Sequence, residues 1–317
     1  MTALQQPIGS DFNTDSTVDD VLIGVDLNGK RAVVTGGYSG IGLVTTRALA
    51  AAGAEVVVPA RRPDAAREQV AGIARVEVAE LDLGDLESVR RFADGLAEDR
   101  PIDMVINSAG IMAAPEARVG QGWESHFGIN HLGHFALVNR LWPLIRTGGA
   151  RVISLSSRGH HFSGIRWDDP QFEDGYDKWL AYGQSKTANA LFAVQLDALG
   201  RHAGVRAFAV HPGAILTPLV RHMTRDEQVE AGYLDQDGNL VDPRFKSPER
   251  GAATQVWAAT SKQLEGLGGL YLEECEVAVP YVEGVEYSGV SDWAVDPVEA
   301  ARLWDLSAEL TGVDAFA

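Results

Sequence analysis

Short apolar runs alternate with longer stretches of helical periodicity over most of the chain. Strands are expected at 31–35, 56–58, 76–81, 104–106, 152–155 and 205–210. Helical segments are expected between them, at 41–52, about 64–71, 85–98, 123–146 and 181–202. Strands that are apolar throughout are buried on both faces, and strands that alternate with helices form parallel sheets. The pattern therefore predicts an α/β protein with a Rossmann-type, doubly wound parallel sheet.

Two regions depart from this rhythm. Residues 1–16 are polar, so we expect them to be loosely ordered, and a helix start follows at Thr17. Residues 218–248 are interrupted by prolines and glycines, which is typical of a substrate lid and also of a plain surface loop. We therefore expect a polar N-terminal extension over 1–27 and a single domain over 28–317, with a lid-like insertion at about 218–248.

Charge and hydropathy narrow the classes of partner. The 317 residues include 27 basic and 44 acidic side chains, so the formal net charge is −17. Nucleic acids and anionic membranes both attract clustered Lys and Arg, so we expect neither partner. The N-terminal stretch is acidic, without the basic and apolar regions of a signal peptide, and no apolar run reaches 18 residues. These features predict a cytoplasmic protein.

Several residues suggest metal or thiol chemistry at first sight. Cys275 is the one cysteine, which excludes an internal disulfide and a thiolate zinc site, and we expect it to be a packed structural residue. His131 and His134 share a helical face, but no nearby carboxylate completes a ligand set, so we predict no metal. The acidic residues around Cys275 are expected to form a solvent-exposed face: Glu273, Glu274, Glu276, Glu283 and Glu286.

The first expected strand runs into a glycine-rich turn that opens a helix. The turn contains Gly36, Tyr38, Ser39, Gly40, Ile41 and Gly42. The first glycine permits a tight turn, the second lets the backbone approach a pyrophosphate, and the third allows close helix–strand packing. The helix N-terminus adds free N–H groups and the positive end of its dipole. This context predicts a dinucleotide site, with a plain β–α turn as the alternative.

The second expected strand indicates which dinucleotide is bound. An acidic residue at its end would bond the adenosine ribose hydroxyls of NAD. Here the strand ends at Ala60 and is followed by Arg61 and Arg62. A guanidinium suits a 2′-phosphate, so we predict NADP(H) in preference to NAD(H), with Arg61 as the contact. The alternative is that both arginines are solvated surface charges.

Tyr182 and Lys186 stand at positions i and i+4 of an expected helix. Such positions share one helical face, so the phenol and the ammonium can share a site. An exposed polar pair is the alternative. Following a nucleotide loop, the pair indicates a functional site.

Together these motifs resemble the short-chain dehydrogenase/reductase family over about residues 28–316. The residues that carry the resemblance are the glycine loop, Asp82-Leu83, Asn107-Ser-Ala-Gly110, Asn130, Ser157, Tyr182, Lys186 and His211-Pro-Gly-Ala-Ile-Leu-Thr217. The chain is most similar to the branch of retinol-dehydrogenase-like and WW-domain-oxidoreductase-like members. That branch often carries an N-terminal membrane anchor, and the acidic extension departs from this pattern.

The resemblance implies a role for each catalytic position. Tyr182 would be the general acid in reduction and the base in oxidation, and Lys186 would lower its pKa and bond the nicotinamide ribose. Ser157 would hold the substrate oxygen, and Asn130 would keep a water-linked proton route to Lys186. The implied cofactor contacts are Asp82 and Leu83 at the adenine, Asn107, Ala109 and Gly110 beside the cofactor, and Ile215 and Thr217 at the carboxamide. Asn107 could instead fix the central sheet.

Two serines compete for the position beside Tyr182. Successive strand residues face opposite sides, so only one of Ser156 and Ser157 should point at the phenol. The family pattern favours Ser157.

Apolar residues gather in two segments that would border the substrate. They are Phe162, Trp167, Phe172, Tyr176 and Trp179 before Tyr182, and Leu219, Met223, Tyr233 and Leu234 in the lid-like insertion. An apolar wall predicts a lipophilic alcohol, aldehyde or ketone as the small-molecule substrate, although these side chains could instead pack their own loops. We predict an NADP(H)-dependent carbonyl reductase or alcohol dehydrogenase. Reduction of a carbon–carbon double bond and a non-catalytic NADP(H) sensor are the alternatives, and a homo-oligomer is left open.

Overall fold

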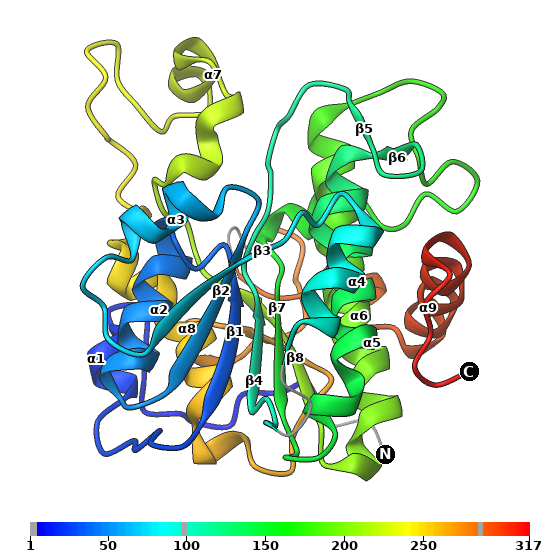
Figure 1. The fold of residues 1–317 in the computed structure, drawn as a ribbon. Helices are drawn as coiled ribbons and strands as arrows, with labels where there is room; N and C mark the ends of the chain where they lie inside the picture. The colour runs from blue at the N-terminus through cyan, green and yellow to red at the C-terminus, as the bar shows by residue number, and fades with distance from the viewer. Residues whose placement is uncertain (1–4, 97–99, 285–287) are drawn as a thin grey trace.

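A central sheet organises the part of the chain described by this computed structural model, residues 5–96, 100–284 and 288–317. Within these residues the sheet has eight strands in the order β10-β9-β8-β7-β4-β1-β2-β3 (Figure 1). The strands are β1 Arg31–Thr35, β2 Glu55–Ala60, β3 Val76–Glu80, β4 Met104–Asn107, β7 Arg151–Leu155, β8 Arg206–His211, β9 Leu270–Glu273 and β10 Glu276–Val277. All neighbours pair in parallel except β9 and β10. The predicted fold class is confirmed.

Helices cover both faces of the sheet (Figure 1). One face carries α1 Val18–Val21, α2 Gly40–Ala51, α3 Pro63–Gln69 and α8 Pro248–Thr260. The other carries α4 Leu86–Asp94, α5 Gly133–Ile145, α6 Lys178–Gly200 and α9 Pro297–Thr311. None of the described helices is long and apolar enough to cross a membrane.

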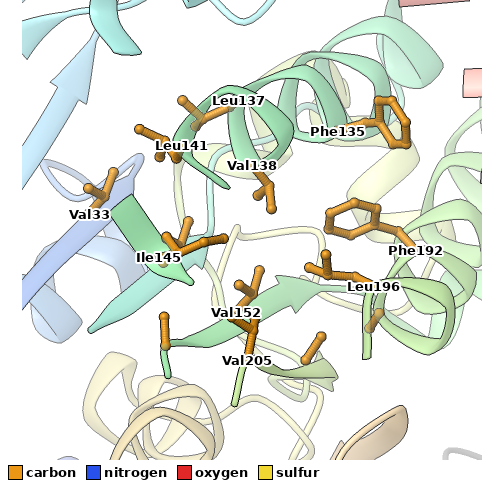
Figure 2. Packing of buried hydrophobic residues seen from close by; sticks show 14 of the residues in the cluster. Val33, Phe135, Leu137, Val138, Leu141, Ile145, Val152, Phe192, Leu196 and Val205 are labelled. Atoms are coloured by element: carbon orange, nitrogen blue, oxygen red, sulfur yellow. The ribbon is translucent and has the colours of Figure 1, made fainter. Parts of the chain in front are cut away.

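Adjacent residues of one strand pack against opposite helical layers, as expected for doubly buried strands. On β1, Ala32 and Val34 pack toward α2 and α8, whereas Val33 packs toward α4, α5 and α6. Figure 2 shows part of the second layer, where Val33 and Val152 from strands meet Leu141 of α5 and Phe192 of α6. These side chains are all within a few per cent of full burial. The packed layers fix the relative positions of the strand ends that build the site.

The prediction of a helix over 123–146 is wrong for its first residues. Trp123–Glu124 is strand β6, paired with β5 Arg118–Val119. The Glu124 carboxylate then accepts hydrogen bonds from the backbone N–H groups of His126 and Phe127. These bonds satisfy N–H groups that have no partner within the first turn of the helix. The helix begins as the π-helical segment Phe127–Leu132 and continues into α5. The end of the expected helix 85–98 lies partly outside the described residues.

The two irregular regions have defined structure. Residues 5–16 run along the molecule in hydrogen-bonded contact with it, so the expectation of loose order is wrong for this stretch. Thr17 forms a capping box with Asp20 at the start of α1, which confirms the predicted helix start. In the 218–248 insertion, α7 Arg225–Glu230 stands at the top of Figure 1, and Glu227 forms an ion pair with Lys178 of α6.

Candidate active site

The strand register brings the candidate site residues together at the carboxyl ends of the central strands. Thr35 of β1 lies opposite Asn107 of β4, and Asn107 lies opposite Ser154 of β7. The segments that follow these three strands therefore begin side by side at their carboxyl ends. Open α/β sheets bind ligands at the carboxyl ends of their strands.

The glycine turn, called the glycine cradle below, passes so close to other backbone of the protein that Gly36 and Gly42 have no room for side chains. A methyl group on Gly42 would lie 2.4 Å from the carbonyl oxygen of Gly36, and one on Gly36 would lie 3.0 Å from the α-carbon of Ala109. Gly36 and Gly40 also have φ angles of +68° and +51°. The N-cap residue Ser39 makes no side-chain capping bond, so no side-chain cap occupies the N-terminal N–H groups of α2. This cradle fits a dinucleotide pyrophosphate.

Thr35 joins the glycine turn to the turn after β4. Its Oγ1 accepts hydrogen bonds from the backbone N–H groups of Ser108 (2.9 Å) and Ala109 (3.0 Å). A methyl group on Gly110 would lie 3.1 Å from Oδ1 of Asn130 and 3.8 Å from Nζ of Lys186. The second turn is therefore packed directly over the predicted catalytic groups.

Asn130 lies behind the cavity wall. It occupies the π-helical segment and is fully buried. Its Nδ2 donates to the Ile111 carbonyl and to Ser185 Oγ (both 3.0 Å), and its Oδ1 accepts from the Ile111 N–H (2.8 Å). The side chain thus holds the segment after Gly110 against α6.

Tyr182 and Lys186 lie on one face of α6, as predicted, with Lys186 Nζ 5.5 Å from the centre of the tyrosine ring. Burial raises the pKa of Tyr182 to about 12, although the neighbouring Ser157 hydroxyl opposes the shift. Burial also lowers the pKa of Lys186 to about 8. Its Nζ donates to the Leu155 carbonyl at 3.0 Å. The residues of the chain alone therefore do not produce the lowered tyrosine pKa expected from the sequence.

The two serines after β7 point in different directions. Ser157 Oγ accepts a hydrogen bond from the Gly159 N–H at 3.0 Å, and the Ser157 hydroxyl opposes the rise in the pKa of Tyr182. Ser156 Oγ instead donates to the backbone carbonyl of Lys186 at 2.8 Å. The two hydroxyls therefore face different ways, as the alternation of side chains predicts, and Ser157 is the serine beside the phenol, as the family pattern favours.

A cavity of about 710 Å³ connects these groups. Among the predicted site residues, those that line it are Gly36, Tyr38, Ser39, Gly40, Ile41, Gly42, Arg61, Asp82, Leu83, Ala109, Gly110, Ser157, Tyr182, Lys186, Ile215 and Thr217. Asn107 and Asn130 are not part of the lining. Asn107 is buried at the end of β4, and neither polar atom of its side chain has a partner within the described structure. A cavity of this size can hold a dinucleotide with a small substrate.

The substrate end of the cavity is less uniformly apolar than expected. Phe162, Trp179, Leu219 and Tyr233 line it, whereas the other apolar residues singled out from the sequence do not: Trp167, Phe172, Tyr176, Met223 and Leu234. Phe172, for example, is buried within its own loop, and Trp167 donates to Glu299. Charged residues complete the wall, including Arg158, the ion pair of Arg244 with Asp242, and the ion pair of Lys246 with Glu274. Sequence reasoning missed these residues because segments far apart in the chain bring them together. Asp242, Arg244 and Lys246 come from the insertion, whereas Glu274 comes from the turn between β9 and β10.

Other side chains with potential for special chemistry have structural partners. His131 bonds Ser307, and His134 bonds the Asn130 carbonyl and Thr35. In the part of the chain that the structure describes, no three potential ligands form a metal-binding group. Cys275 is buried, and burial raises the pKa of its thiol to about 11, so the prediction of a packed structural cysteine is confirmed.

The expectation of a solvent-exposed acidic face is wrong. Glu273 is buried and accepts hydrogen bonds from Ser288 and the Gly289 N–H. Glu274 pairs with Lys246, and Glu276 accepts bonds from the N-terminal segment. Glu283 is exposed, and Glu286 lies outside the described residues.

The fold and the site together define a Rossmann-type protein with a Ser–Tyr–Lys set beside a dinucleotide-sized cavity. The family model described as short chain dehydrogenase matches residues 30–228. This chain belongs to the short-chain dehydrogenase/reductase family and is an oxidoreductase enzyme.

Similar proteins extend the likeness over almost the whole chain. A protein of Streptomyces lividans named "Probable oxidoreductase" is 43% identical, over 90% of this chain and 98% of its own length. Retinol dehydrogenase 11 of Mus musculus is 37% identical, over 91% of this chain and 88% of its own length. A crystal structure of an uncharacterised protein from Mycobacterium paratuberculosis has a TM-score of 0.74 and 35% identity, and the match covers 95% of this chain and 99% of that one.

Proposed function

We propose that this enzyme is NADP(H)-dependent and interconverts a lipophilic ketone or aldehyde with the corresponding alcohol. The convergence of Ser157, Tyr182 and Lys186 on the cavity that also contains the glycine cradle carries the proposal. The name of the mouse relative, retinol dehydrogenase, supports an alcohol as one side of the reaction. Bound NADPH would supply the hydride, and NADP⁺ would accept it in the reverse direction.

The proposed cofactor preference rests on the end of β2. Arg61 and Arg62 line the cavity immediately after the strand, and no acidic residue stands at that tip. A guanidinium can form paired, charge-assisted hydrogen bonds with a 2′-phosphate. Asp82 and Leu83, which follow β3, would border the adenine.

The proposed acid–base step uses the phenol of Tyr182. With a pKa of about 12, Tyr182 carries its proton at neutral pH and can donate it to a substrate oxygen as the hydride arrives at carbon. Ser157 Oγ would donate a second hydrogen bond to the same oxygen and stabilise its developing negative charge. The positive charge of Lys186, 5.5 Å from the ring, would stabilise the phenolate left behind.

The proposed substrate class rests on the lid side of the cavity. Phe162, Trp179, Leu219 and Tyr233 form an apolar surface near the reacting groups. Burial of such a surface favours a lipophilic carbonyl compound.

Turnover and product analysis test this proposal. Purified enzyme should oxidise NADPH in the presence of lipophilic aldehydes or ketones and should form the alcohols. Tyr182→Phe removes the hydroxyl that would donate the proton, so kcat should fall by at least about 100-fold. The ring remains, so NADPH should still bind. Tyr281→Phe, a variant of an exposed tyrosine outside the cavity lining, is the matched control. A product reduced at a carbon–carbon double bond, or full activity in Tyr182→Phe, would contradict the proposal.

A further inference from the structure

The N-terminal segment 5–16, called the strap below, is bound to the β9–β10 edge of the sheet. Gln5 Nε2 donates to the backbone carbonyls of Tyr271 (2.7 Å) and Ala278 (2.8 Å), and its Oε1 accepts from the Tyr271 N–H (3.0 Å). One side chain therefore clamps β9 and the residue that follows β10.

A single carboxylate fixes the next turn of the strap. Glu276 accepts hydrogen bonds from the consecutive backbone N–H groups of Ile8 (2.7 Å), Gly9 (2.8 Å) and Ser10 (2.8 Å). Gln263 Nε2 donates to the Ser10 carbonyl at 2.9 Å. Burial alone would raise the pKa of Glu276, but the backbone donors outweigh it and hold the pKa below its usual value. The ionised carboxylate is thus the form that the strap stabilises.

The strap then reaches the cofactor cavity. Asp15 forms a 3.2 Å ion pair with Arg250 at the start of α8. The next residue, Gly251, packs against the glycine loop, since a methyl group there would lie 3.2 Å from the Ile41 side chain. Thr14, beside Asp15, lines the same cavity as Tyr38 and Arg61.

We propose that the strap forms a wall of the dinucleotide pocket and that the Thr14 hydroxyl hydrogen-bonds the bound cofactor there. This inference rests on the proposed NADP(H) site and extends it to a segment that precedes the Rossmann core. The ligand groups within reach of such a hydroxyl are phosphate and ribose oxygens, because the glycine loop holds that part of a dinucleotide. The strap contributes to affinity by its contact, while Gln5 and Glu276 provide its anchorage.

Thermodynamic linkage gives the proposal a second, reciprocal consequence. If the docked strap strengthens NADPH binding, bound NADPH must strengthen docking of the strap by the same factor. The backbone amides of residues 8–16 should therefore exchange hydrogen more slowly in the NADPH complex than in the free protein.

Four full-length variants test the proposal by NADPH titration. Thr14→Val keeps the shape and removes the hydroxyl, so we expect affinity to fall about 3- to 10-fold, as for loss of one hydrogen bond. Glu276→Gln weakens the strap anchor, so we expect weaker NADPH binding together with faster exchange of the Ile8–Ser10 amides. Glu309→Gln, the same substitution at an exposed site on α9, is the matched control and should bind like wild type. Arg61→Ala tests the underlying cofactor site.

The results for these variants distinguish a failure of the proposed role of the strap from a failure of the proposed NADP(H) site. Unchanged NADPH affinity in both Thr14→Val and Glu276→Gln, together with weaker binding in Arg61→Ala, would overturn the role of the strap and leave the proposed function standing. NADPH affinity unchanged in Arg61→Ala would overturn the proposed cofactor preference instead. Strap amides that exchange equally fast with and without NADPH would also count against the strap as a pocket wall.

Discussion

Ser156 and Ser157 are neighbours in the chain, yet their hydroxyls act on different parts of α6. The Ser157 hydroxyl influences the pKa of the Tyr182 phenol, whereas Ser156 donates a hydrogen bond to the backbone carbonyl of Lys186. The alternation of side chains along a strand was enough to predict this difference. The pKa values of Tyr182 and Lys186 could not be predicted in the same way, because they depend on burial by segments far apart in the sequence.

Alanine substitutions should separate the two serines. Ser157→Ala removes the proposed donor to the substrate oxygen, so we expect kcat to fall about 100- to 1,000-fold. Ser156→Ala removes a support of the Lys186 backbone, so we expect a stability loss of about 1 kcal/mol and a much smaller change in kcat. Steady-state kinetics and urea unfolding measure both effects. A larger loss of kcat in Ser156→Ala would contradict the assignment.

Lys186 gives the reaction an expected pH dependence. Burial lowers its pKa to about 8, so the ammonium is protonated below that value and loses its charge as the pH rises through it. In the proposed mechanism this charge stabilises the phenolate formed in reduction, so reductive kcat/KM should be flat near pH 7 and fall above about pH 8. Rates measured with NADPH between pH 6 and 10 test this. A rise of reductive kcat/KM across that range would contradict the role of Lys186.

At the scale of elements, the continuous apolar runs predicted the central strands, because doubly buried strands carry this signal themselves. Strands β9 and β10 were not predicted, since they are short and joined by Glu274 and Cys275 in the left-handed region. The strap could not be predicted either. Its order comes from Glu276 and Gln263, more than 250 positions away in the sequence, rather than from its own composition.

His134 connects two elements of the site. Its Nδ1 donates to the Asn130 carbonyl at 2.9 Å, and its Nε2 accepts from the Thr35 hydroxyl at 2.9 Å. The carbonyl can only accept, so the proton resides on Nδ1. The imidazole thereby ties the π-helical segment to the end of β1.

Removal of this connection should destabilise the protein. His134→Leu loses two buried hydrogen bonds, so we expect the free energy of unfolding to fall by about 2 kcal/mol. His202→Leu, the same substitution at an exposed position, should change it by less than about 0.5 kcal/mol. Urea unfolding compares the two variants, and equal stability losses would contradict a structural role for His134.

The whole molecule combines a large negative charge with histidines buried in the neutral form. Burial lowers the pKa of His131 to about 3 and that of His134 to about 4. The unfolded chain takes up protons on these groups as the pH falls below about 6.5, whereas the folded protein does not until about pH 4. This difference favours unfolding in mild acid.

Stability should therefore fall between pH 6.5 and pH 4, by up to about 3 kcal/mol from His134 alone. Partial neutralisation of the net charge of −17 acts in the opposite direction by reducing self-repulsion. We expect the histidine effect to prevail, so urea unfolding should give a lower free energy of unfolding at pH 5 than at pH 7. Near pH 5, unfolding of His131→Asn should take up about one proton fewer than unfolding of the wild type, so its free energy of unfolding should depend less steeply on pH. An unchanged slope would contradict the linkage.

Parallel titration of the protein with NADPH and NADH, followed by nicotinamide fluorescence, tests the proposed cofactor site, on which the account depends, most directly. Arg61 lines the cavity, and we propose that its guanidinium bonds the 2′-phosphate, so NADPH should bind at least about tenfold more tightly than NADH. Arg61→Ala should remove most of that difference while NADH affinity stays nearly unchanged. Tighter binding of NADH, or equal losses for both dinucleotides in Arg61→Ala, would contradict the assignment of this site to NADP(H).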